Sequence, residues 1–163
     1  MMHSARFFPA VLALCCSFVL CAAAQAADSL QNADAAATYV GSAACQQCHD
    51  QEYDNFAKYS KKAHSRQNVE KMSAKLTREE LEGCYACHTT GYGKKGGFVD
   101  YGTTPQLGDV GCETCHGPGS VHAESGDTSA ITRKPSVDSC LVCHNAERIQ
   151  NFNFRPLRYS GAH

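Results

Sequence analysis

Four copies of one short pattern constrain this chain more than any other feature: two cysteines separated by two residues, with a histidine directly after the second. In this pattern the two thiols can add to the two vinyl groups of one haem, and the histidine then lies beneath the iron as an axial ligand. Zinc knuckles also use paired cysteines, but they do not require a histidine after each pair. The repetition therefore favours c-type haem over zinc or a disulfide framework. The copies are Cys45-Gln46-Gln47-Cys48-His49, Cys84-Tyr85-Ala86-Cys87-His88, Cys112-Glu113-Thr114-Cys115-His116 and Cys140-Leu141-Val142-Cys143-His144.

The cysteine count agrees with this interpretation. Of the 11 cysteines, Cys15, Cys16 and Cys21 lie near the N-terminus, and the other eight all belong to the motifs. No cysteine outside the N-terminal segment is left over for a structural disulfide, a zinc site or a catalytic thiol. We therefore predict four covalently bound haem c groups. The predicted attachment residues are Cys45, Cys48, Cys84, Cys87, Cys112, Cys115, Cys140 and Cys143, and the predicted proximal iron ligands are His49, His88, His116 and His144.

The N-terminus has the pattern of a secretory signal peptide. Arg6 precedes an apolar run from Phe7 to Ala24, and Ala24-Gln25-Ala26 fits the small-residue site at which such peptides are cleaved. A membrane helix is the alternative, because the run is just long enough to span a bilayer. We predict a signal peptide over residues 1–26 and export to the periplasm or the extracellular space.

The rest of the sequence is short and poor in the side chains that build an apolar core. Leu, Ile, Val and Phe make up about 14% of the 137 residues that follow the predicted cleavage site, which is below the roughly 20% at which disorder is suspected. Four porphyrins would supply the missing apolar surface. We predict a disordered lead-in over residues 27–38 and one tetrahaem domain over residues 39–163. Its fold class is mainly α with extensive irregular coil, organised around four closely packed haems.

Local patterns place the helices and turns. Apolar residues at three- and four-residue steps predict a helix from Asp50 to about Lys75, which would carry His64. The sequence Thr77-Arg78-Glu79-Glu80 predicts a capping box that opens a short helix into the second motif. The glycine- and lysine-rich run at 91–97 lacks the spacing of a phosphate-binding loop and predicts a turn. We expect a short extended segment and loop at 98–109.

The number of histidines bears on the chemistry. Electron-transfer haems usually have two strong axial ligands, whereas ligand-binding haems keep one position open. The chain has eight histidines, and His3 lies in the predicted signal peptide, so seven remain for eight axial positions. Beyond the proximal set, His64, His122 and His163 are the candidate distal ligands. Met72 is either a further ligand or filler on the core-facing side of its helix. We therefore expect at least one haem without a second histidine.

At these residues the chain resembles the cytochrome c-554 family of tetrahaem cytochromes. The most specific parts are the segments Tyr39-Val40-Gly41 and Ala63-His64, the run 91–97, and the run 111–119. The resemblance implies stacked haem pairs and a ligand scheme. In that scheme His122 joins His49 on the first haem, His64 joins His116 on the third, His163 joins His144 on the fourth, and the second haem on His88 is five-coordinate.

The function predicted from these features is electron transfer between redox protein partners, a donor and an acceptor. The small net charge of −1 gives no reason to expect a nucleic-acid partner, and the mature chain is expected to lack a membrane span. Lys58, Lys61, Lys62 and Arg66 form a candidate docking patch, which is also readable as a solvated helix face. Two alternatives stay open: an enzyme acting on nitric oxide, nitrite, hydroxylamine or peroxide at the open haem, and a subunit of a homo-oligomer or conductive filament.

Overall fold

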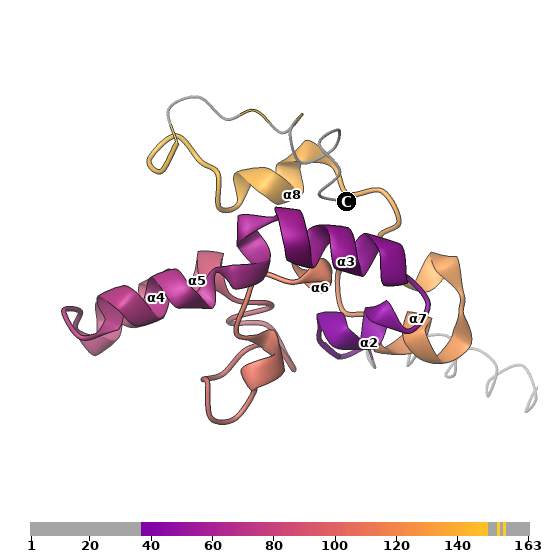
Figure 1. Ribbon diagram of the computed structural model, residues 1–163, viewed down its shortest axis with the longest axis horizontal. Coiled ribbons are helices and arrows are strands. Elements are labelled where there is room, and N and C mark those ends of the chain that lie inside the picture. The colour runs from indigo at the N-terminus through magenta and orange to yellow at the C-terminus, as the bar shows by residue number, and fades with distance from the viewer. Residues whose placement is uncertain (1–36, 150–152, 154, 156–163) are drawn as a thin grey trace, which may run out of the picture. The chain divides into compact units, whose positions relative to one another are not determined.

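The computed structural model describes residues 37–149, 153 and 155, all of which belong to the unit Ala37–His163. The predicted signal peptide, most of the predicted lead-in and His163 lie outside the described residues. Every regular element within the described part is helical, as Figure 1 shows. The elements are α2 (Ser42–Gln46), α3 (Asp50–Tyr59), η1 (Lys61–His64), α4 (Arg66–Ser73), α5 (Arg78–His88), η2 (Pro105–Leu107), α6 (Cys112–His116), α7 (Ser120–Ser125), η3 (Thr128–Ala130) and α8 (Val137–Leu141).

The helix predicted from Asp50 to about Lys75 is broken. Its first part, α3, ends where Ser60 adopts an extended conformation (φ −92°, ψ 120°), and its last part, α4, ends at Ser73. The Ser60 hydroxyl accepts a hydrogen bond from the Lys62 N–H at 3.4 Å, so the serine opens the 3₁₀ turn η1. Serine side chains compete with the helical backbone in this way. His64 therefore lies on η1 and not on a continuous helix.

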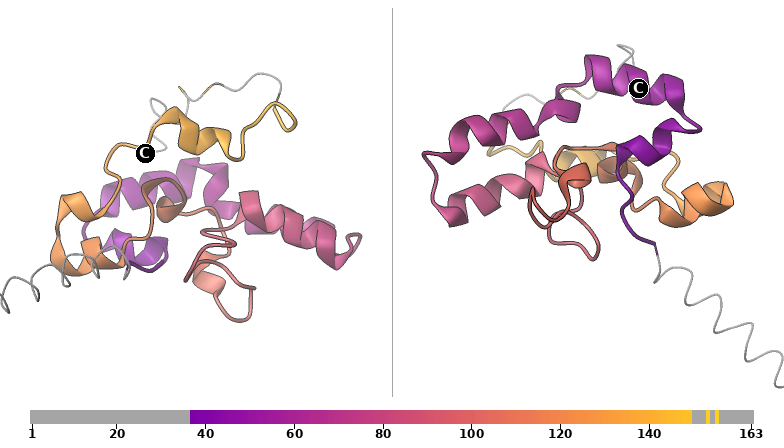
Figure 2. Two further views of the ribbon diagram at one scale, coloured as in Figure 1. Left: turned by 180° about the vertical axis from the view of Figure 1, so that it is seen from behind. Right: turned by 60° about the horizontal axis from the view of Figure 1, so that its bottom comes forward.

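The capping box predicted at Thr77 is confirmed. The Thr77 hydroxyl accepts from the Glu80 N–H, and the Glu80 carboxylate accepts from the Thr77 N–H at 2.8 Å. The helix α5 then runs antiparallel to α4, as the right-hand view of Figure 2 shows. The run at 91–97 is a turn, as predicted, closed by hydrogen bonds from Lys94 N–H to the Gly91 carbonyl and from Gly97 N–H to the Lys94 carbonyl.

The apolar core is small and lies around α5. Its buried residues are in mutual contact: Val69 of α4, Tyr85 of α5, Phe98 of the following loop, and Leu107 of η2. The Tyr85 ring makes edge contacts with the Phe98 ring at 5.1 Å and the Tyr101 ring at 5.8 Å between centroids. We call this set of five residues the aromatic core. None of the helices within residues 37–149 combines the length and the apolar character that crossing a bilayer demands.

Candidate haem-binding sites

Each motif sits on one turn of helix. The second motif forms the last turn of α5, the third is α6 itself, and the first and fourth run from α2 and α8 into the following turn. In the first and fourth motifs the histidine N–H donates to the carbonyl of the first cysteine, His49 to Cys45 and His144 to Cys140, both at 2.9 Å. Residues three and four apart on a helix lie on one face. The turn thus presents both thiols and the imidazole of a motif to the same side.

The first and third motifs are in contact. The Cys45 thiol donates a hydrogen bond to the Cys112 sulfur, which raises the pKa of Cys45 and lowers the pKa of Cys112 to about 6. The Ser42 hydroxyl accepts from the Cys112 N–H at 3.1 Å. Haems attached at these two sulfurs, as the motifs predict, would start from points that lie side by side.

The second and fourth motifs also meet. The Cys143 sulfur lies 3.9 Å from the Ala86 carbonyl oxygen. Burial, followed by a hydrogen bond with Cys87, raises the pKa of the Cys143 thiol to about 12. Burial raises the pKa of Cys115 as well, and Cys140 of the fourth motif is a neighbouring charge. Motifs distant in sequence are therefore brought together through their sulfurs. Within residues 37–149, no group of three or more His, Cys, Asp or Glu side chains is arranged to hold a metal ion directly.

The rings of His49 and His122 lie at a spacing that suits an iron between them. Their centroids are 6.2 Å apart and their planes differ by 26°. Metal–imidazole bonds are about 2 Å long, so two rings on opposite sides of one metal have centroids roughly 6 Å apart. The His122 Nδ1 lies 2.9 Å from the Asp127 carbonyl oxygen. A histidine held by a carbonyl at one nitrogen offers the other to a metal, so this pair fits a haem.

For the other predicted pairs of axial ligands, the structure shows the surroundings of His116, His64 and His144 individually. His116 Nδ1 lies 2.7 Å from the Thr132 carbonyl oxygen, which leaves Nε2 for a metal. His64 Nε2 lies 2.8 Å from the Ala57 carbonyl oxygen, and His64 lines a hollow of about 430 Å³ together with Lys61, Gln67 and Asn68. Burial and the nearby Lys62 ammonium lower the pKa of His144, which favours the neutral imidazole that ligates metals.

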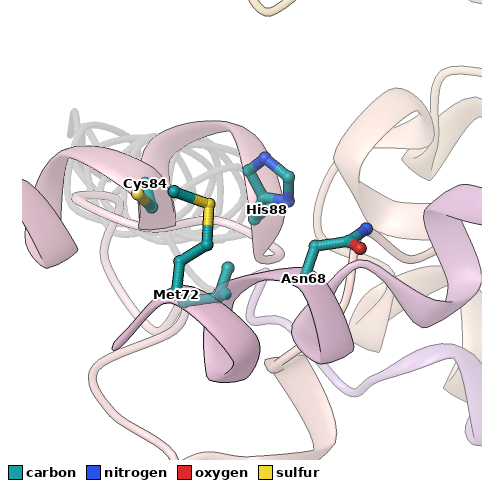
Figure 3. Close-up of a pocket in the computed structure, with 5 residues that line it drawn as sticks. Asn68, Met72, Cys84 and His88 are labelled. Atoms are coloured by element: carbon teal, nitrogen blue, oxygen red, sulfur yellow. The ribbon is translucent and has the colours of Figure 1, made fainter. Parts of the chain in front are cut away.

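His88 stands beside a cavity of about 60 Å³ between α4 and α5. Figure 3 shows the Met72 side chain reaching from α4 toward Cys84, with the His88 ring beside it and Asn68 one turn away. Met72 is 57% exposed, so its interpretation as core filler is wrong for the protein alone. His88 Nδ1 is buried without a hydrogen-bond partner among the described residues. This imidazole lacks the carbonyl support that His116 and His122 have.

A buried carboxylate inside the third motif was not predicted from the sequence. Glu113 is 2% exposed, and its two oxygens accept from the N–H groups of Val40, Gly41 and Gly119. A glutamate on a five-residue helix carries no local pattern that distinguishes an inward from an outward side chain. The only hint is the glycines at 111, 117 and 119, which leave the backbone around it open to close approach.

Residues 44–117 match the family described as cytochrome c554 and c-prime. Over this stretch the chain is similar to the cytochrome c-554 family. A curated relative, cytochrome c-554 of Nitrosomonas europaea, is 37% identical over 84 residues, which cover 49% of this chain and 34% of the relative. The chain thus spans about a third of the length of the relative it matches. No solved structure matches the chain. The family agrees with c-type haem and with the mainly helical fold.

Proposed function

We propose that this chain is an exported tetrahaem c-type cytochrome that carries electrons between two redox proteins. The observation that carries the proposal is the contact between motifs: Cys45 meets Cys112, and Cys143 meets Cys87. Haem, when bound, accepts and releases one electron at its iron. Attachment at neighbouring sulfurs would bring the haems close enough for electrons to pass between them. A chain of this size that bound a single haem would have no need of contacts between motifs.

The histidines divide the four sites into closed and open ones. We assign His49 and His122 to the first haem, because their ring spacing suits two axial ligands. We pair His116 with His64 on the third haem and His144 with His163 on the fourth, as the family scheme implies. His88 is then left without a second histidine. Two strong ligands keep an iron in one spin state as it changes charge, so three sites are suited to electron transfer and one to binding a small ligand.

We assign the docking of a redox partner to the lysines of α3 and η1. Arg66 is already engaged, because it forms an ion pair with Glu70 at 2.6 Å and lies over the Tyr101 ring at 4.4 Å. Lys58 lies over the Tyr59 ring at 5.0 Å, and Lys61 lines the hollow beside His64. The proposed docking patch is therefore Lys58, Lys61 and Lys62, which would attract an acidic surface on a donor or acceptor.

The test is the haem content and redox behaviour of the protein purified after export. We expect a mass increase of four haems, reversible reduction in several steps, and a low-spin electron paramagnetic resonance signal from three haems. Replacement His122→Ala should convert one low-spin haem to high spin, whereas His64→Ala should convert a different one. Fewer than four attached haems, or none that is reversibly reduced, would overturn the proposal. Elution as a monomer would remove the filament alternative.

A second candidate function is ligand binding or turnover at the haem on His88. The histidine count favours it, because His88 is left without a second histidine once His64, His122 and His163 are assigned to the other haems. Addition of carbon monoxide or nitric oxide to the reduced protein tests the idea, with Met72→Ala as the companion variant. Ligand binding in both proteins supports an open site. Binding that appears only in Met72→Ala would show that the thioether closes the iron, and pure electron transfer would remain.

A further inference from the structure

The carboxylate of Glu113 links the first and third motifs. Its Oε1 accepts from the Val40 N–H at 3.0 Å and the Gly119 N–H at 2.7 Å, and its Oε2 accepts from the Val40 N–H at 3.1 Å and the Gly41 N–H at 2.8 Å. Val40 and Gly41 lead directly into α2, which carries the first motif. We call Glu113 with these three N–H groups the Glu113 clasp.

The clasp requires its glycines. Gly41 has φ +84°, in the left-handed region that side chains rarely adopt. A Cβ on Gly119 would lie 3.2 Å from Glu113 Oε1, tighter than ordinary contact. The backbone approaches the carboxylate closely on both sides, so the clasp is a fixed arrangement of α2 against α6 and not a loose surface contact.

Burial of a carboxylate is costly unless hydrogen bonds compensate it. The three N–H groups do so at Glu113, and hydrogen bonds to ionised acceptors are roughly twice as strong as neutral ones. N–H groups bring no net charge, and within the described residues no lysine, arginine or histidine forms an ion pair with Glu113. A negative charge is therefore held in the protein beside Cys112 and close to Cys45.

We propose that Glu113 is a positioning residue that fixes the first haem against the third and holds the reduction potentials of this pair low. The inference rests on the proposed function. An iron with two imidazoles carries one more positive charge when oxidised than when reduced. A nearby negative charge in a medium of low dielectric constant stabilises the oxidised form. The second and fourth motifs carry no such buried carboxylate among the described residues.

The experiment compares Glu113→Gln with Glu124→Gln in the full exported protein. Glu124 lies exposed on α7, so its replacement removes the same charge from the surface. After haem counting, potentials are measured by titration followed by visible and electron paramagnetic resonance spectra. We expect Glu113→Gln to raise the potentials of the two haems on His49 and His116 and to leave the other two in place, while Glu124→Gln leaves all four unchanged.

The sign of the shift separates charge from mere structure. If Glu113 only held the fold, its replacement would admit water, which stabilises the more charged oxidised iron, and the potentials would fall. Unchanged potentials, a fall, or an equal rise in all four haems would each overturn the inference. Four haems and reversible reduction in the wild type test the proposed function separately, so the two failures are distinguishable.

A second variant covers the case in which Glu113→Gln does not accumulate with four haems. Glu113→Asp keeps the charge but shortens the reach, so the clasp weakens. We expect potentials like those of the wild type together with a lower midpoint of unfolding. A rise in the potentials of the first and third haems in Glu113→Asp would overturn the inference, because the charge is still present there.

Discussion

Two regions of this molecule hold the same kind of motif by opposite means. The first and third motifs are joined by polar groups: the Glu113 clasp and the Ser42 hydroxyl, which accepts from Cys112. The second motif instead rests on the aromatic core, in which Tyr85, inside the motif, packs against Phe98 and Tyr101. Only the second arrangement buries much apolar protein surface.

The difference indicates which region depends more on its haems. A hydrogen bond contributes about 1 kcal/mol in net terms to the free energy of unfolding. A fully buried large apolar side chain contributes about 1.5–3 kcal/mol to it. The aromatic core therefore gives the second motif a protein framework of its own. The first and third motifs have directional contacts and little apolar filling, which porphyrins attached there would supply.

The largest expected effect comes from removing one haem from each region. The double replacement Cys112→Ala with Cys115→Ala takes the haem from the polar region, and Cys84→Ala with Cys87→Ala takes it from the aromatic one. We expect the first to prevent accumulation of folded protein and the second to give a folded three-haem protein. Haem staining, mass and protease resistance provide the comparison. Equal yields of both folded proteins would contradict the contrast between the regions.

The next effect concerns the aromatic core itself. Leu107 is 1% exposed, and replacement of a buried leucine by alanine typically costs about 2–5 kcal/mol. Leu107→Ala should therefore lower the free energy of unfolding by an amount in this range in urea titrations of the haem-loaded protein. Val137→Ala on α8 is the control, since Val137 is 42% exposed and lies outside the haem motifs. If the two costs were the same, the core would not be the main apolar support.

A smaller effect is expected at the start of α5. Thr77→Ala removes the hydroxyl of the capping box, and loss of such a cap costs about 1 kcal/mol. Thr77→Ser keeps an oxygen in place and should restore most of the stability. Urea unfolding followed by helical circular dichroism measures both. An unchanged midpoint in Thr77→Ala would mean that the second haem, and not the cap, holds this helix.

The smallest effect is expected at Tyr101, whose hydroxyl is buried without a partner among the described residues. Burial raises the pKa of this phenol to about 12 from an ordinary value near 10. Tyr101 therefore loses its proton at a lower pH in the unfolded chain than in the folded protein. Its titration lowers the free energy of unfolding as the pH rises from about 10 to about 12. Tyr101→Phe should be as stable as the wild type, or up to about 1 kcal/mol more stable, near neutral pH.

The same variant should lose stability less steeply in alkali. The cation–π position of Arg66 over the ring is kept by phenylalanine, so the comparison isolates the hydroxyl. Urea midpoints at pH 8 and at pH 11 measure it. A parallel decline of both proteins would show that Tyr101 does not titrate in this window.

Features that depend on neighbouring residues were predictable from the sequence, and features that depend on distant contacts were not. The capping box at Thr77 and the turn at 91–97 follow from local hydrogen bonds and glycine, and both were predicted and confirmed. The break at Ser60 was missed, because apolar spacing continues across it while the serine hydroxyl takes over the backbone N–H of Lys62.

The features that were not predicted depend on contacts between residues that lie far apart in the sequence. Glu113 is buried by groups that lie 72 and 73 residues earlier in the chain, and no local pattern encodes that approach. The spacing of His49 and His122 is likewise long-range. The ligand pairs of His64 with His116 and of His144 with His163 stay predictions, and His163 lies outside the described residues.

The contact between Cys45 and Cys112 also imposes an order on how the protein is made. In an oxidising compartment, two thiols in contact, one of them with a pKa lowered to about 6, readily form a disulfide. A disulfide there would consume one attachment sulfur from each of two motifs. Attachment of haem to both motifs before α2 docks on α6 would keep these two sulfurs from that loss.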